Sequence, residues 1–382
     1  MSTLAAVGQS IESLLATPPY DRSPQERQCA LLPLLKQELA YASDQNPSFR
    51  NYVEHWPIDY RTAGKIADLP FLPVAAFKAN PPLSLVPATE VIRTLTSSAT
   101  SGQIPSHIVL DAATSKRMTR SVIAIIRSFI GPARRPYLVI DTAENITPQS
   151  QLGARGAAIQ GLRSFATDVF CCLSRNQTSE PSLDLNELLA FAGKWKDADV
   201  LVYGFTYIIW THLVQPLLRQ GIVLGMPKVH VLHSGGWKRL EQQSVTKDVF
   251  VRDVAAVLGC CTDRVIDYYG MVENVGVVYP DCQQGNKHVP VLAEVIVRDP
   301  LTLAPVRAGQ QGLVHVCSVL PTSFPGFLLL TDDMADLIDY DGCPCGRRGT
   351  YFRFARRVPK AEIRGCGNLE TARYSSGQSS QV

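Results

Sequence analysis

The sequence has almost no excess of charge of either sign. Its 382 residues include 37 Lys and Arg against 34 Asp and Glu, a formal net charge of +3. It contains no polybasic run and no basic patch interleaved with aromatic residues, so we expect neither nucleic-acid nor membrane-surface binding. The most apolar window, residues 200–213, is too short to span a bilayer and includes Thr and His. The N-terminal residues lack a basic segment followed by an unbroken apolar one, so we expect no signal peptide.

The ten cysteines lack the regular spacing of a small secreted disulfide framework. With 46% apolar and 19% charged residues, the composition is that of an ordinary globular protein. We therefore expect a reducing cytoplasm, in which some cysteines bind metal or take part in chemistry. The cysteines on or beside apolar runs are expected in the core: Cys29, Cys171, Cys172, Cys260, Cys261 and Cys317.

Apolar periodicity predicts an α/β protein. Three- and four-residue spacing predicts helices within residues 1–50. Short apolar runs then alternate with helical patterns, which is typical of a sheet covered by helices on both faces. Beyond Pro290 the helical patterns stop and strands predict a β-rich subdomain. The expected strands are 137–140, 169–173, 200–203, 229–232, 265–268, 291–297 and 312–316; the expected helices are 113–129, 183–196 with Ser182 as its N-cap, 207–220 and 244–258.

Residues 94–106 form a hydroxyl-rich stretch, TLTSSATSGQIPS, between two apolar runs. We expect a hairpin turn or a strand-edge loop there. Small residues let an anion approach backbone N–H groups, so the stretch is a candidate phosphate loop. It lacks the Gly-Lys-Ser/Thr of a Walker loop, and a plain surface turn is the alternative. The candidate phosphate ligands are Thr96, Ser97, Ser98, Thr100, Ser101 and Gly102.

Four further polar stretches are expected on loops at apparent strand ends, where open α/β sheets bind their ligands. They are HSGGW at 233–237, YYGMVEN at 268–274, TDD at 331–333 and RRVPK at 356–360. Each has a simpler interpretation. Gly235 and Gly236 could form a plain turn, Glu273 could cap a helix, and Asp332 with Asp333 could be solvated turn residues. Arg356 and Arg357 could form a charged edge.

Taken in order, these stretches resemble the motifs of the adenylate-forming superfamily. LPFLPVAAFK at 69–78, HSGGW and KAEIRGCG at 360–367 further resemble the acyl-protein synthetase (LuxE-type) branch, which is near the phenylacetate–CoA ligases. The resemblance covers roughly residues 65–368. It implies ATP-dependent activation of a fatty or aromatic carboxylic acid as acyl-AMP, followed by transfer to a thiol. An acyl- or aryl-CoA ligase and a non-catalytic nucleotide-binding partner of a reductase complex are the alternatives.

The resemblance assigns a role to individual residues. Ser234, Gly235, Gly236, Tyr269 and Gly270 would form the adenine site, with Tyr269 against one face of the base. Glu273 would be the carboxylate associated with Mg²⁺, a hard ion that prefers oxygen ligands. Asp333 would accept from the ribose hydroxyls, and Arg357 (or Arg356) would reach ribose or phosphate. His233 would either line the acyl pocket or be a structural histidine.

The family pattern also predicts four regions. Residues 1–65 form an N-terminal helical region, 66–290 an α/β nucleotide- and acid-binding body, 291–355 the β-rich subdomain, and 356–382 a short tail after the hinge arginines. Three positions depart from the superfamily pattern: Ala99 replaces a glycine, Ser106 a lysine and Asp332 the glycine of Thr-Gly-Asp. The tail is too short for a mobile C-terminal domain that would bring a catalytic lysine, so we expect that domain to be truncated.

Two groups of cysteines are candidates for chemistry. Cys282, His288, Cys343 and Cys345 have the residue types of a tetrahedral zinc site that pins the β-rich subdomain, with free thiols or turn residues as the alternative. Cys366 lies between glycines near Lys360 and Arg364, whose charges favour a thiolate. Acyl-protein synthetases carry the acyl group on such a cysteine, so the acceptor would be Cys366, CoA or a partner protein such as an acyl reductase; a buried structural cysteine is the alternative.

Overall fold

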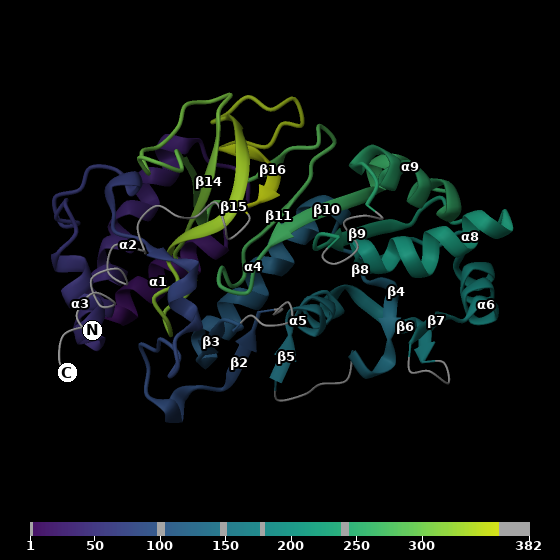
Figure 1. Cartoon of the computed structure of the whole chain (residues 1–382), viewed down its shortest axis with the longest axis horizontal. Coiled ribbons are helices and arrows are strands. Elements are labelled where there is room, and N and C mark those ends of the chain that lie inside the picture. Colours follow the sequence, from purple (N-terminus) through teal and green to yellow (C-terminus); the bar gives the residue numbers. More distant parts are fainter. Residues whose placement is uncertain (1–2, 98–103, 146–150, 176–179, 238–243, 359–382) are drawn as a thin grey trace, which may run out of the picture.

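The structure is a computed structural model that describes residues 3–97, 104–145, 151–175, 180–237 and 244–358 (Figure 1). Within these ranges no helix is both long and apolar enough to cross a membrane. The predictions for Ser98, Thr100, Ser101, Gly102 and Cys366 concern residues outside these ranges.

A seven-stranded sheet forms one half of the molecule, in the order β11-β10-β9-β8-β4-β6-β7. Its five central strands are parallel and its two edge strands antiparallel. The prediction of an α/β sheet is confirmed, because all five parallel strands coincide with predicted apolar runs. The bounds are β4 Arg135–Thr142, β6 Ala166–Arg175, β7 Pro181–Leu183, β8 Leu201–Phe205, β9 His230–Ser234, β10 Val265–Gly270 and β11 Val278–Pro280.

The helices around this sheet begin where the chain supplies a capping side chain. Asp111 accepts from the backbone N–H of Thr114 at the start of α4, Ala112–Ile130. Helix α6, Leu185–Trp195, is capped by Asp184 rather than by Ser182, because the Asp184 carboxylate reaches the N–H of Glu187 at 3.0 Å. The predicted helix 207–220 is three segments: α7 Thr206–Ile208, a π-helical turn Ile209–Val214, and α8 Gln215–Gln220. The remaining helices are α5 Ala154–Gly161 and α9 Lys247–Leu258.

The second large sheet is built mainly from residues beyond Pro290, as the sequence predicts. Its order is β12-β16-β15-β14-β13, and β1 adds to β15. The N-terminal helices α1 Thr3–Leu15, α2 Pro24–Gln45 and α3 Pro47–Glu54 lie at the end of the molecule that holds this sheet, and α1 also packs against α4 (Figure 1). The strands are β1 Leu72–Pro73, β12 Lys287–His288, β13 Ala293–Arg298, β14 Gln311–Ser318, β15 Leu328–Asp339 and β16 Tyr351–Arg357.

A small third sheet carries the ends of the hydroxyl-rich loop. Strand β2, Arg93–Thr96, pairs antiparallel with β3, His107–Leu110, and parallel with β5, Gln151–Gly153. The hairpin prediction is therefore confirmed at its two strands. Short 3₁₀ turns complete the described elements: Ile66–Asp68, Val74–Lys78, Ala88–Glu90, Ala143–Asn145, Arg163–Phe165 and Thr262–Arg264.

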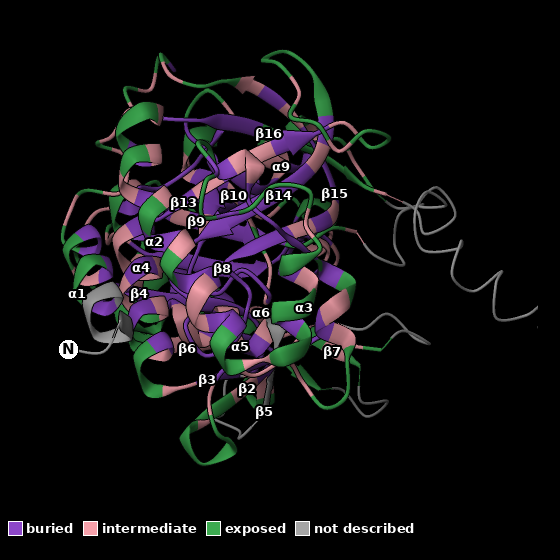
Figure 2. Cartoon of the chain, turned by 90° about the vertical axis from the view of Figure 1, so that its left-hand side faces the viewer, coloured by how far each residue is buried: buried purple, intermediate pink, exposed green. Residues whose placement is uncertain are grey.

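Two apolar cores stabilise the two halves. One lies between the N-terminal helices and the antiparallel sheet, and the other surrounds the parallel sheet. Buried residues line the central strands of both sheets (Figure 2). The prediction that six cysteines lie in the core is wrong for Cys29 and Cys261, which are exposed; Cys172 and Cys317 are buried, and Cys171 and Cys260 are half-buried. Cys29 lies on α2 at a position that faces solvent, and Cys261 follows the end of α9.

Candidate active site

The carboxyl ends of β8, β9 and β10 meet at one edge of the parallel sheet. In register, Phe205 of β8 pairs with Ser234 of β9, and His233 of β9 pairs with Asp267 of β10. The Ser234 hydroxyl lies 3.1 Å from that of Tyr203, and the Thr206 hydroxyl donates to the Ser234 carbonyl at 3.3 Å. This edge is the place where ligands bind in open α/β sheets.

Gly235 and Gly236, which follow β9, have no side chains to cover the backbone there. Gly235 has φ of +77°, in the left-handed region that favours glycine, and a Cβ there would meet the Phe205 ring at 3.5 Å. A Cβ on Gly236 would meet no described atom within 4 Å. The pair is therefore a turn, as the simpler interpretation expects, and also a backbone surface that a flat ring can approach.

Tyr269, Asp333 and Arg357 come together from three strands. The Tyr269 hydroxyl donates to Oδ2 of Asp333 at 2.9 Å, and Nε of Arg357 donates to Oδ1 at 3.0 Å. The Asp333 side chain is 3% exposed, whereas that of Arg357 is 74% exposed. The Asp333 carboxylate thus accepts one hydrogen bond from the Tyr269 phenol and one from the exposed Arg357 guanidinium.

The location of these residues differs from the prediction. Thr331–Asp333 lie inside β15 and Arg356–Arg357 at the end of β16, not on loops after strands. Thr331 supports the position, because its hydroxyl accepts from the backbone N–H of Asp333 at 3.1 Å and donates to the Val314 carbonyl at 2.8 Å. The solvated-turn interpretation of Asp333 is therefore wrong.

Burial, and then the Asp333 carboxylate, raise the pKa of Tyr269 well above its ordinary value, so the phenol remains a neutral donor. The same carboxylate raises the pKa of Arg357. The Tyr269 ring is nearly parallel to that of Phe354, with centroids 5.5 Å apart and an interplanar angle of 28°. Phe354 was missed by the sequence analysis; the only signal was its place in the alternating pattern YFRFARR.

Glu273 lies in the turn between β10 and β11 and is 6% exposed. No helix follows it in the described chain, so the helix-cap alternative is wrong. The turn is held against α4 at Gly276, which has φ of +77° and whose Cβ would lie 2.7 Å from Cα of Met118. Asn274 adds a hydrogen bond from Nδ2 to the Tyr279 hydroxyl at 3.1 Å.

The described ends of the hydroxyl-rich loop are joined at Ser97 and Ser106. The Ser106 N–H donates to the Ser97 hydroxyl at 2.8 Å, and the Ser97 N–H donates to the Ser106 carbonyl at 3.1 Å. Thr96 pairs with His107 in the ladder of β2 and β3. Of the six predicted phosphate ligands, Thr96 and Ser97 thus lie where strand β2 of the hairpin meets the loop.

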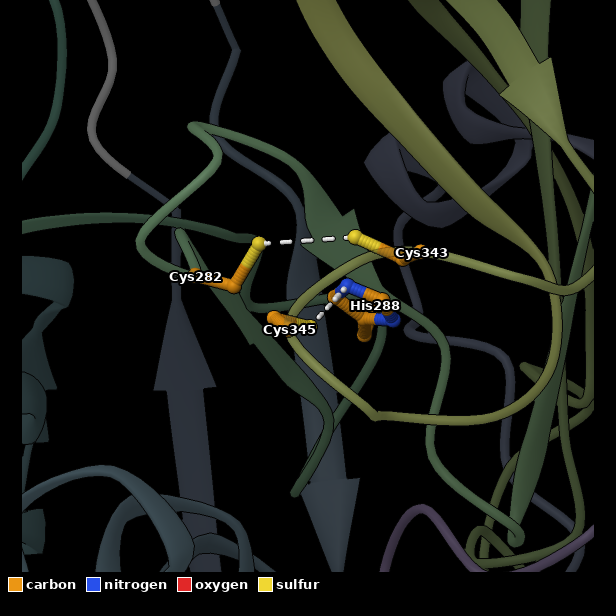
Figure 3. A group of neighbouring side chains, drawn as sticks. All are labelled: Cys282, His288, Cys343 and Cys345. Carbon is orange, nitrogen blue, oxygen red and sulfur yellow. Dashed lines mark hydrogen bonds between the residues drawn. The ribbon is translucent and has the colours of Figure 1, made fainter.

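The four predicted metal ligands form one cluster (Figure 3). The Cys282 and Cys343 sulfurs are 3.9 Å apart, and the Cys345 sulfur is 3.2 Å from Nε2 of His288. All four donor atoms lie within 4.8 Å of one another. A tetrahedral zinc ion with Zn–S bonds of about 2.3 Å needs sulfur–sulfur edges of about 3.8 Å. The donor set and its spacing therefore fit zinc.

The surroundings of the cluster suit a neutral imidazole and a thiolate at Cys343, whereas burial raises the pKa of the Cys282 thiol to about 12. Burial, with smaller effects from Arg347 and Arg27, lowers the pKa of His288 to about 4. Burial alone would raise the pKa of the Cys343 thiol, but hydrogen bonds from the Cys345 backbone and the Asn286 amide outweigh it and lower that pKa. The His288 ring stacks on Tyr351, with centroids 5.3 Å apart.

Comparison with known proteins identifies the family of this chain. The family model for "Acyl-protein synthetase, LuxE" matches residues 3–374. The chain belongs to the acyl-protein synthetase (LuxE) family. It is 25% identical over 353 residues to a long-chain-fatty-acid–luciferin-component ligase of Vibrio harveyi, covering 91% of this chain and 89% of that one. The protein of the same name from Aliivibrio fischeri is 23% identical over 367 residues, covering 92% and 91%.

The fold of this LuxE-family chain is that of an adenylate-forming enzyme. A crystal structure of 2-hydroxyisobutyryl-CoA ligase with 2-HIB-AMP and CoA matches it with a TM-score of 0.68 at 19% identity, over 89% of this chain and 77% of that one. The predictions of family and fold class are confirmed. As a member of this family, the chain is a ligase that activates a carboxylic acid as acyl-AMP and transfers the acyl group to a thiol.

Proposed function

We propose that this ligase binds ATP and Mg²⁺ where the ends of β9 and β10 meet β15 and β16, and that it activates a long-chain fatty acid there. The main support is the Tyr269–Asp333–Arg357 cluster. In it the Tyr269 hydroxyl and Nε of Arg357, from separate strands, donate to the Asp333 carboxylate at 2.9 and 3.0 Å. A buried carboxylate beside an exposed guanidinium suits a ribose diol next to a phosphate, because one accepts hydrogen bonds and the other neutralises anionic charge.

The other motif residues have complementary roles in this proposal. Ser234, Gly235, Gly236, Tyr269 and Gly270 form the adenine side. The hydroxyls and N–H groups of residues 96–102 hold the outer phosphates. Glu273 supplies an oxygen ligand for Mg²⁺, which when bound neutralises charge on the phosphates.

The reaction has two balanced steps. A carboxylate oxygen of the acid attacks the α-phosphorus of ATP, and the bond to the bridging oxygen breaks to release pyrophosphate. A thiolate then attacks the acyl carbon, and AMP leaves with the oxygen that came from the acid. In this chain the acceptor is Cys366, which would then pass the acyl group to a partner such as an acyl reductase.

The acid is inferred from its surroundings and from the relatives. Aromatic side chains gather beside the glycine turn: Phe205 is in edge contact with Tyr207, and Trp210 with Trp237. These aromatic side chains favour a substrate acid with an apolar chain. Both bacterial relatives are named for long-chain fatty acids.

The Cys/His cluster holds a structural zinc ion in this proposal, with all four positions filled by the chain. Zinc-bound thiolates and an acceptor thiol at Cys366 both require reducing conditions, so we propose that the protein acts in the cytoplasm. Residues 66–290 carry the nucleotide and the acid, 291–355 supply Asp333, and 356–382 carry the acceptor thiol, while 1–65 support the antiparallel sheet.

ATP–pyrophosphate exchange with a panel of fatty and aromatic acids tests the proposal. We expect exchange that depends on Mg²⁺ and is fastest with long-chain fatty acids. Replacing Glu273 by Gln should lower kcat about 100-fold, since one charge-stabilising contact is worth 10²–10³ in rate. ATP binding without exchange would instead identify a non-catalytic partner, and turnover that requires CoA but not Cys366 would identify a CoA ligase.

A further inference from the structure

Two residues next to the metal ligands reach the candidate active site. Asp281 directly precedes Cys282, Lys287 directly precedes His288, and the two form an antiparallel bridge. The Lys287 ammonium lies 2.9 Å from Oδ2 of Asp267 and 3.1 Å from Oδ1 of Asp281, and its side chain is only 3% exposed. Lys247 at the start of α9 pairs with the other Asp281 oxygen. The cluster therefore holds two positive and two negative charges.

This pairing holds the middle of β10 in place. The Asp281 N–H donates to the Asp267 carbonyl at 2.8 Å, in addition to the side-chain contacts through Lys287. Asp267 is two residues before Tyr269, the residue that contacts Asp333. A buried ion pair of this kind contributes little net stability but fixes geometry, because each charge is costly to leave unpaired.

The chain of contacts continues from Asp267 to His233. Nδ1 of His233 is 3.8 Å from Oδ1 of Asp267 and 3.0 Å from the Thr206 hydroxyl. The Thr206 hydroxyl has one proton for two acceptors, Nδ1 of His233 and the Ser234 carbonyl. The Asp267 carboxylate near Nδ1 favours the tautomer with the imidazole proton on Nδ1, in which Thr206 donates to the carbonyl. Nε2 is buried, and no described residue hydrogen-bonds to it. His233 thus presents a lone pair immediately before the glycine turn.

We propose that Lys287 and Asp281 are positioning residues that couple the Cys/His cluster to the nucleotide side of the site. Metal binding would fix the chain on both sides of the β11–β12 turn, and the ion pairs would carry this constraint to Asp267, His233 and Tyr269. The inference rests on the proposed function for its kinetic effect. It explains why a charge as costly as the buried Lys287 ammonium is placed between a metal site and an adenine site.

Kinetics of the Lys287→Met holoenzyme test the coupling. We expect the KM for ATP in pyrophosphate exchange to rise at least tenfold while kcat stays within about threefold, because binding geometry is lost and the reacting groups are intact. Lys287→Arg should restore most of the affinity. The exposed Lys196→Met is the matched control and should leave both constants unchanged. A merely structural role would lower the active fraction, and hence kcat, without raising KM.

A second readout is independent of activity. In ¹⁵N NMR spectra, with the signals assigned by His233→Gln, we expect the Nδ1–H tautomer of His233 in the holoprotein. Its signals should shift on chelation of the metal and in Lys287→Met. The isosteric Asp281→Asn should produce the same shift and carries the test if Lys287→Met does not fold.

Unchanged ATP KM and unchanged His233 signals in a folded, metal-containing Lys287 or Asp281 variant overturn the coupling. A wild-type protein without exchange on any acid overturns the proposed function instead, and the imidazole signals then still decide whether the metal cluster acts on His233.

Discussion

At the scale of single residues, Asp333 makes the most specific contact of the site. Its two oxygens are already positioned by Tyr269 and Arg357, and it is buried. A buried carboxylate that accepts charge-assisted hydrogen bonds contributes more than a neutral amide in the same place.

Replacing Asp333 by Asn should therefore raise the KM for ATP by about 10–100-fold, which corresponds to losing about 1.5–3 kcal/mol of binding. Steady-state pyrophosphate exchange measures the change. Asp336→Asn is the control, because that residue lies on the same strand and bonds Gln311 at the surface. Equal ATP affinity in the two variants would remove Asp333 from the nucleotide site.

The variant Cys366→Ser tests whether Cys366 is the thiol that accepts the acyl group. In Cys366→Ser, exchange should persist at the wild-type rate, because adenylation precedes the thiol step, while the acyl group should no longer stay on the protein. Intact mass after incubation with ATP and the acid detects the adduct. The exposed Cys261→Ser should still be acylated; an adduct that survives in Cys366→Ser assigns the acceptor to another residue.

At the scale of elements, the apolar periodicity predicted the parallel strands and most helices, because local pattern and burial agree there. It failed at β15, where TDD was expected to be a loop. Asp333 is tolerated inside that strand only because Tyr269 and Arg357 satisfy its charge. Strand β16 was missed because YFRFARR has too many arginines for an ordinary strand, and one of them pairs with Asp333.

The buried charge pairs between segments of the chain were not predicted from the sequence, unlike the Cys/His cluster. Nothing in the sequence around Lys287 indicates that it is buried, because its burial depends on Asp267 of β10 and on Asp281, which directly follows β11. The family motifs named Tyr269, Asp333 and Arg357, which the structure brings into contact, but the charge pairs around Asp267 were visible only in the fold.

Arg27 of α2 and Glu294 of β13 are a further example, 267 residues apart. The guanidinium makes contacts of 2.8–3.1 Å with the carboxylate and also donates to the Val289 carbonyl and the Thr350 hydroxyl. Arg27→Met should destabilise the protein by about 3–5 kcal/mol, because it leaves the Glu294 carboxylate without its positively charged partner.

Urea unfolding of Arg27→Met, with the exposed Arg61→Met as control, measures that loss, and the ATP KM at low temperature should not change. A loss below about 1 kcal/mol would show that the junction of α2 with the antiparallel sheet is stabilised by apolar packing alone.

At the scale of the whole molecule, the Cys/His cluster joins the edges of the two large sheets, since Cys282 follows β11 of one sheet and His288 lies in β12 of the other. Purified protein should contain about one zinc per chain by mass spectrometry of the metal. Cys343→Ser should lose the metal and lower Tm, whereas the exposed Cys29→Ser should not. Less than half an equivalent in metal-replete protein would contradict a structural zinc site.

The proposed reaction begins with direct attack of a carboxylate on the α-phosphate of ATP. The most direct measurement is the fate of ¹⁸O from a labelled fatty acid during a full turnover with a thiol acceptor. We predict one labelled oxygen in AMP and none in pyrophosphate. Label in inorganic phosphate, with ADP as the nucleotide product, would mean an acyl phosphate route and would contradict the account.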